Sequence, residues 1–198
     1  MTAVDPADPR RRLPLLAAAA VVLAGLLVQA GALAALGQPP ICTCGIVRLW
    51  TGDILGPENS QQIFDWYTPS HVLHGVLFYA AARLLAPRLP LLAAFALAIG
   101  LEVTWELIEN APATIARYRT QALAQGYFGD SILNSLSDTL AATTGWLLAA
   151  RLPARLVVAA ALATEIGTAV AVRDNLTLNV LQLIHPIDAV AAWQTAPR

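Results

Sequence analysis

The sequence contains no lysine, so arginine supplies all 12 basic residues, and only 13% of the 198 residues are charged. Soluble domains have about 25% charged and about 45–50% apolar residues, whereas 57% of this chain is apolar and its mean hydropathy is +0.60. The low charge excludes a disordered chain, a coiled coil and a nucleic-acid-binding module, so no nucleic-acid partner is expected. The composition predicts an all-α protein embedded in the lipid bilayer.

Five apolar runs predict a polytopic transmembrane helix bundle. They cover residues 13–36, 71–86, 89–108, 132–150 and 154–172, close to the ~20 residues that a spanning helix needs. The first run exceeds the ~7–15 residues of a signal-peptide core, which favours a retained span; a cleaved signal, with Ala32 and Ala34 at its cleavage site, is the alternative. We therefore predict one integral membrane domain over 1–198, whose segment 176–198 lies at the membrane interface.

The arginines predict the orientation of the bundle, because cytoplasmic segments are enriched in basic residues. Placing the tail 1–12 in the cytoplasm puts seven of the 12 arginines on that side: Arg10, Arg11, Arg12, Arg83, Arg88, Arg151 and Arg155. We predict a multi-pass protein of the cell inner membrane, with its N-terminus in the cytoplasm and its C-terminus in the periplasm. The loops 37–70 and 109–131 are then periplasmic.

Acidic residues concentrate on the opposite side: 11 of the 13 fall outside the membrane or in the outer half of a span. An ionisable side chain within a span costs a few kcal/mol or more, so each is a functional candidate. Glu102, Glu106 and Glu109 share one helix face because they are spaced by four and three residues. The next span carries Asn134 and Asp138 on one face at a similar depth. Together these residues predict a polar cavity that opens outward.

The candidate site residues fall into three groups. The catalytic candidates are Glu102, Glu106, Asp138 and Glu165. The substrate-binding candidates are Asp130, Asn134, Arg173 and Asp174. The metal-binding candidates are His71, His74, Glu106 and Glu109.

The chemistry of this set favours a divalent transition metal as cofactor, because imidazole and carboxylate together suit Zn, Mn or Fe. Helix bundles build such sites from His and carboxylates on facing helices. A bound metal would activate water toward a lipid or lipid-linked substrate. However, the chain has neither the His-Glu-x-x-His motif of zinc hydrolases nor a Gly-x-Ser-x-Gly nucleophile motif.

Two other classes of function stay open. In a scaffold or assembly factor, the polar cluster would serve only helix packing and docking of a lipid or membrane-protein partner. A proton-coupled or ion-coupled transporter fits less well, because the cytoplasmic half of every span is almost entirely Ala, Leu and Val.

Three further features carry expectations. Gly75, Gly100, Gly145 and Gly167 are expected at close helix contacts. Trp50, Trp66, Tyr67 and Tyr127 are expected to anchor the external span ends as an aromatic belt. Cys42 and Cys44 are open to three interpretations: a disulfide formed in an oxidising compartment, a soft-metal or redox site, or no role.

The sequence also resembles a known family through a set of long motifs. These are CTCG (42–45), LWTGD (49–53), NS (59–60), DWYTPSHVLHG (65–75), WELIEN (105–110), YFGDSILNS (127–135) and RDNLTLN (173–179). They are similar to those of uncharacterised protein family 0314, or domain of unknown function 2585, a group of alphaproteobacterial multi-pass membrane proteins. The resemblance covers residues 14–193 and implies an inner-membrane protein without implying a reaction. A weaker similarity, in a His pair, a Trp-Glu pair and a Gly-Asp pair, extends to VanZ-like membrane proteins.

Overall fold

The computed structural model describes residues 13–197 and is all-helical, as the composition predicts, with no named strand in that range. The five long helices are α1 (Leu15–Ala35), α2 (Thr68–Leu85), α3 (Leu91–Glu109), α5 (Ile132–Arg151) and α6 (Ala154–Val172). Three short ones are α4 (Pro112–Tyr118), α7 (Leu176–Ile184) and α8 (Asp188–Thr195). The predicted cytoplasmic tail 1–12 lies outside the described residues.

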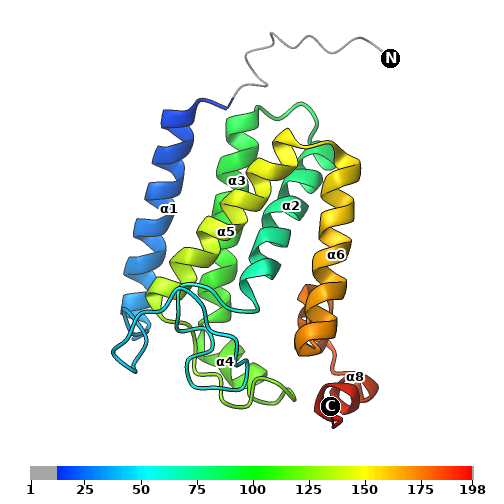
Figure 1. Cartoon of the computed structure of the whole chain (residues 1–198). Coiled ribbons are helices and arrows are strands. Elements are labelled where there is room, and N and C mark those ends of the chain that lie inside the picture. Colours follow the sequence, from blue (N-terminus) through cyan, green and yellow to red (C-terminus); the bar gives the residue numbers. More distant parts are fainter. Residues whose placement is uncertain (1–12, 198) are drawn as a thin grey trace.

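The long helices run alternately up and down, so their connections gather at two ends of the bundle (Figure 1). The segments 36–67 and 110–131 lie together at the end opposite the start of α1, with α4 and α8 beside them. We call this the loop end. Short links 86–90 and 152–153 join the helices at the other end.

Three helices, α1, α3 and α6, are long and apolar enough to cross a membrane. Their exposed surface is largely aliphatic: Leu16 of α1 and Val170 of α6 have exposed fractions of 89% and 79%. Apolar surface of this extent on several helices indicates membrane association. Helices α2 and α5 are less apolar than these three, because they carry His71, His74, Asp138 and several hydroxyl residues.

Helices α2 and α5 form the most extensive contact between helices and keep most of these polar residues inside the bundle. Gly75 and Gly145 allow this contact: a Cβ atom on Gly75 would lie 1.9 Å from the carbonyl oxygen of Ala142, and one on Gly145 would lie 1.9 Å from that of Val72. The expectation for these two glycines is confirmed. It is wrong for Gly100 and Gly167, because a Cβ atom there would meet nothing within 4 Å.

The half of the bundle near the start of α1 has an apolar core. Ala18 of α1, Phe95 of α3 and Trp146 of α5 belong to one buried cluster. Phe95 and Tyr79 both contact Trp146 edge to face, with ring centroids 4.8 and 5.2 Å away. Such pairs add to the stabilisation that burial gives.

The two long connections pack on each other at the loop end. The amide of Ser131 donates to the carbonyl of Ser60 (3.0 Å), and the amide of Ile132 to that of Pro39 (2.8 Å). The fully buried Gln61 donates to the carbonyl of Gly129 (2.8 Å). The connections therefore form an ordered cover over one end of the bundle.

Candidate functional site

The buried centre of the site is a carboxylate held between two histidines. His71 and His74 lie one turn apart on α2 and face Glu102 on α3, and all three side chains are buried. The Nδ1 atom of His71 lies 2.7 Å from Glu102 Oε1, and that of His74 lies 3.0 Å from Glu102 Oε2. When each Nδ1–H donates to the carboxylate, the Nε2 atom of each neutral ring keeps its lone pair.

Two further carboxylates approach His71 without a hydrogen bond to it. Glu106, one turn beyond Glu102, has its Oε1 atom 3.2 Å from His71 Nδ1, and this buried atom has no hydrogen-bond partner. Asp138 of α5 has its Oδ2 atom 3.9 Å from His71 Nε2. A buried polar atom without a partner costs free energy, and a bound ligand that pairs with it would remove this cost.

The cluster extends to α1 through a residue that the sequence interpretation missed. Gln29 is fully buried and donates to Ser135 Oγ (2.6 Å), and Ser135 donates to Glu106 Oε2 (2.6 Å). Thr139 donates to Gln29 Oε1 (2.7 Å). A single amide inside an apolar span is a signal that could have identified Gln29, because polar groups in a membrane need partners.

The residues that can hold a metal form overlapping groups. His71, Glu106 and Asp138 each offer an atom within 4.8 Å of the others, as do His71, His74 and Glu102, and Glu106, Glu109 and Asp130. Each of the four predicted metal ligands and three of the four catalytic candidates belong to at least one of these groups, and each of the three groups holds two of the predicted ligands. In the first group, the Nδ1 atom of His71 is hydrogen-bonded to Glu102. A metal-ligating imidazole commonly has such a carboxylate partner on its other nitrogen.

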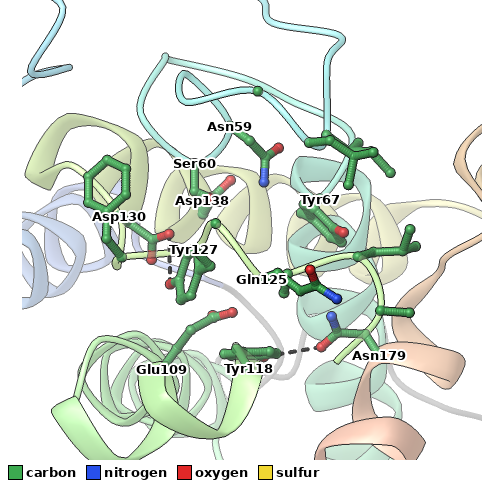
Figure 2. Close-up of a pocket in the computed structure, with 18 of the residues that line it drawn as sticks. Asn59, Ser60, Tyr67, Glu109, Tyr118, Gln125, Tyr127, Asp130, Asp138 and Asn179 are labelled. Atoms are coloured by element: carbon green, nitrogen blue, oxygen red, sulfur yellow. Dashed lines mark hydrogen bonds between the residues drawn. The ribbon is translucent and has the colours of Figure 1, made fainter. Parts of the chain in front are cut away.

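A cavity of about 330 Å³ adjoins this cluster at the loop end. His71 and Asp138 form part of its wall. Figure 2 shows Glu109, Tyr118, Tyr127 and Asp130 around one side of it, with Tyr67 and Asn59 on another. Leu55 and Leu123 add apolar wall. The cavity therefore connects the buried polar centre with the cover formed by the two connections.

Hydrogen bonds fix the rim of the cavity. Asp130 accepts from Asn110 Nδ2 (2.6 Å) and Tyr127 OH (3.0 Å), and burial raises its pKa to about 6. Tyr118 donates to Asn179 (3.1 Å). Burial, reinforced by nearby carboxylates, raises the pKa of Tyr118 and Tyr127 well above the usual value, so both hydroxyls keep their protons. Tyr67 and Tyr127 thus belong to the cavity and do not form the expected aromatic belt.

Four predicted site residues belong neither to the metal-ligand groups nor to the lining of the cavity. Glu165 accepts from the amides of Leu176 (3.0 Å) and Thr177 (3.2 Å) at the start of α7, where a carboxylate satisfies the free N–H groups of a helix. Arg173 donates to backbone carbonyls at the end of α8. Both residues therefore position the C-terminal helices.

The other two, Asn134 and Asp174, do not line the cavity but contact segments that do. Asn134 donates to the carbonyl of Gln62 (2.8 Å) and joins α5 to the first connection. Asp174 accepts from Tyr67 OH (3.3 Å), and burial raises the pKa of Asp174 to about 6. The remaining substrate-binding candidate, Asp130, does line the cavity.

Cys42 and Cys44 form a disulfide within the first connection. Only after reduction of this disulfide would the two thiols, with Glu58, form a group of potential metal ligands, away from the histidines.

Comparisons with known proteins agree on one family. A family model described as a protein of unknown function (DUF2585) matches residues 33–196. A UPF0314 protein of Brucella anthropi is 48% identical over 177 residues, which cover 89% of this chain and 90% of that protein. One of Paracoccus denitrificans is 51% identical over 161 residues, covering 81% and 83%. One of Sphingopyxis alaskensis is 48% identical over 178 residues, covering 90% and 92%. No solved structure matches the chain.

Proposed function

We propose a function for this chain, which belongs to the DUF2585 family of UPF0314 proteins. The proposed function is that of a multi-pass inner-membrane protein that binds a divalent transition metal next to an outward-facing cavity. With that metal it hydrolyses a lipid or lipid-linked substrate.

The proposed topology has five spans, α1, α2, α3, α5 and α6, with the N-terminus in the cytoplasm. Its support is the alternation of the five helices and the gathering of both long connections at one end (Figure 1). Helices α2 and α5 cross the membrane because they turn most of their polar side chains toward each other and toward α3. A reporter fused after Arg198 should be active in the periplasm; a cytoplasmic reporter would contradict this topology.

One observation carries the metal proposal: Glu102 engages the Nδ1 atoms of both histidines. This leaves the Nε2 atom of a neutral His71 with its lone pair, 3.9 Å from Oδ2 of Asp138. Glu106 completes a group of one imidazole and two carboxylates from three packed helices. Imidazole and carboxylate oxygens together favour Zn, Mn or Fe over Ca and Mg.

The reaction follows from the place of this group at the cavity wall. A bound metal would supply a Lewis acid that polarises the substrate and lowers the pKa of water. The free oxygen of Glu106, Oε1, would be its ligand atom for the metal, and Glu102 holds His71 in place. Leu55, Leu123 and Phe128 give the cavity the apolar wall that a lipid would contact.

The apolar core argues against a transporter. Ala18, Phe95 and Trp146 belong to the apolar cluster in the half of the bundle away from the cavity, which favours no polar path to the other side within residues 13–197. A pure scaffold is the remaining alternative, and it requires no metal.

The test is elemental analysis of the detergent-purified chain after incubation with Zn, Mn or Fe(II) and removal of free metal. We expect about one tightly held ion per chain, lost in His71→Ala and Glu106→Gln. His185→Ala is the matched control, because His185 is exposed at the end of α7. A folded wild-type chain that holds none of these metals would overturn the metal proposal and favour the scaffold.

A further inference from the structure

The cavity beside the proposed metal group has more acidic than basic residues in its wall: three carboxylates face the single imidazole of His71. The carboxylates are those of Glu109, Asp130 and Asp138, and among residues 13–197 the lining includes no arginine. The arginines of the surrounding segments are engaged elsewhere: Arg117 donates to the carbonyls of Gln182 and Leu183, and Arg119 to that of Tyr127. A ligand that carries positive charge would supply the missing balance.

The tyrosines of the cavity present oxygen lone pairs rather than hydrogens. The hydroxyl of Tyr127 donates to Asp130 (3.0 Å), that of Tyr118 to Asn179 (3.1 Å), and that of Tyr67 to Asp174 (3.3 Å). Because each hydrogen is already used, these hydroxyls can only accept from a ligand. Tyr118 and Tyr127 also lie edge to face, with centroids 5.3 Å apart, and offer aromatic surface to a cation.

Two buried acceptors at the cavity have no hydrogen-bond partner. One is Oδ1 of Asp138, whose residue is 4% exposed, and the other is Oδ1 of Asn59. Figure 2 shows Asn59 and Asp138 at the same side of the cavity. A primary ammonium has three N–H donors and one positive charge, so it matches both the charge and the free acceptors. A quaternary ammonium has no donor, and a phosphate would meet the carboxylates unfavourably.

We propose that this cavity binds a primary ammonium group, carried either by an aminoalkyl lipid head group or by a free amine. Glu109 and Asp130 provide the charge and the tyrosines surround the ammonium. Its hydrogens are accepted by Oδ1 of Asn59 and by Oδ1 of Asp138, the oxygen that is not the one facing His71. This ammonium group would belong to the substrate of the proposed hydrolase. Only the reaction depends on the proposed function. Recognition of the amine depends on side chains of the chain itself.

Calorimetric titration of the full-length chain in detergent, with a chelator present to remove metal, tests this proposal. The probes are dihexanoyl phosphatidylethanolamine, dihexanoyl phosphatidylglycerol, free ethanolamine and N-acetylethanolamine. We expect phosphatidylethanolamine to bind at least about tenfold more tightly than phosphatidylglycerol, because a charge-assisted hydrogen bond contributes about that factor. Binding of free ethanolamine but not N-acetylethanolamine would assign the site to free amines as well, whereas lipid binding alone would assign it to the head group.

Variants locate the site. Glu109→Gln and Asp130→Asn should each remove the preference for the amine. Asp53→Asn is the matched control, because Asp53 is an exposed acid of the same end and does not line the cavity. Equal binding of the two lipids, or a preference that survives both substitutions, would overturn the proposal. Because metal is absent from this measurement, failure of the metal proposal leaves its outcome unchanged.

Discussion

At the end near the start of α1, helices α1, α3 and α5 meet through Ala18, Phe95 and Trp146, whereas toward the loop end they meet through Gln29, Glu106 and Ser135. The apolar contact is non-directional, and many residues of similar volume could form it. The polar contact is a chain of specific hydrogen bonds that still leaves an oxygen of Glu106 unpaired. The apolar half also leaves one buried polar atom unpaired, Nε1 of Trp146, so the halves differ in chemistry: only the polar half brings ionisable side chains together.

The largest expected effect concerns the contact of α2 with α5, which runs through both halves. Gly75→Ala and Gly145→Ala each place a Cβ atom 1.9 Å from a backbone oxygen. We expect a loss of about 3 kcal/mol or more, seen as a fall in melting temperature or a loss of monodisperse protein. Gly100→Ala and Gly167→Ala are the matched controls and should lower neither measurement, since a Cβ atom there meets nothing within 4 Å and alanine is the better helix former. Equal effects of all four would refute the packing described.

The next prediction separates the two halves. Phe95→Ala removes a ring that is 1% exposed, and it should lower the free energy of unfolding by about 3 kcal/mol. The metal bound per folded chain should stay as in the wild type, because Phe95 belongs to the apolar cluster. Loss of metal from a chain that remains folded would show that the halves are not independent.

Glu102→Gln acts on the polar half alone. The amide can accept from one histidine but must donate to the Nδ1 atom of the other, which moves that ring's hydrogen to Nε2. We expect metal affinity to fall about 10- to 100-fold, the usual effect of losing a partner of a ligating His. Competition with a metal-sensitive dye would measure it, with Thr104→Ser as a control on the exposed face of α3. Unchanged affinity would mean that Glu102 does not position the metal ligands.

The smallest effect concerns Asp174, behind the cavity. Its pKa is about 6 in the folded chain against an ordinary value of 3.8, because burial disfavours the charge. Since the folded state prefers the protonated form, stability should increase as the pH falls from about 7 to about 4. Asp174→Asn removes this cost and should stabilise the chain by about 1–2 kcal/mol at pH 8, with no gain at pH 4. Melting curves at both pH values would measure it; an identical shift at both would contradict the assignment.

The positions of the long helices could be predicted because each is a run of apolar residues. The site was predictable where ionisable residues interrupt such a run: Glu102, Glu106 and Asp138 are expensive in a membrane and therefore point inward. The position of Glu165 along its span could not show its role, because its carboxylate accepts hydrogen bonds from the amides at the start of α7. The helical period does not show which face meets a neighbour, so Gly100 could not be distinguished from Gly75. The roles of Tyr67 and Tyr127 depend on how the two connections fold over the bundle, and no local pattern encodes that.

The most direct test of the central claim is X-ray absorption spectroscopy at the metal edge of the zinc-loaded chain. We predict a shell of nitrogen and oxygen ligands at about 2.0–2.1 Å that includes imidazole scattering and is absent in His71→Ala. A shell with sulfur at about 2.3 Å would place the metal at Cys42 and Cys44 instead, with their disulfide reduced. That result, or an unchanged spectrum in His71→Ala, would contradict the assignment of the metal to the buried polar cluster.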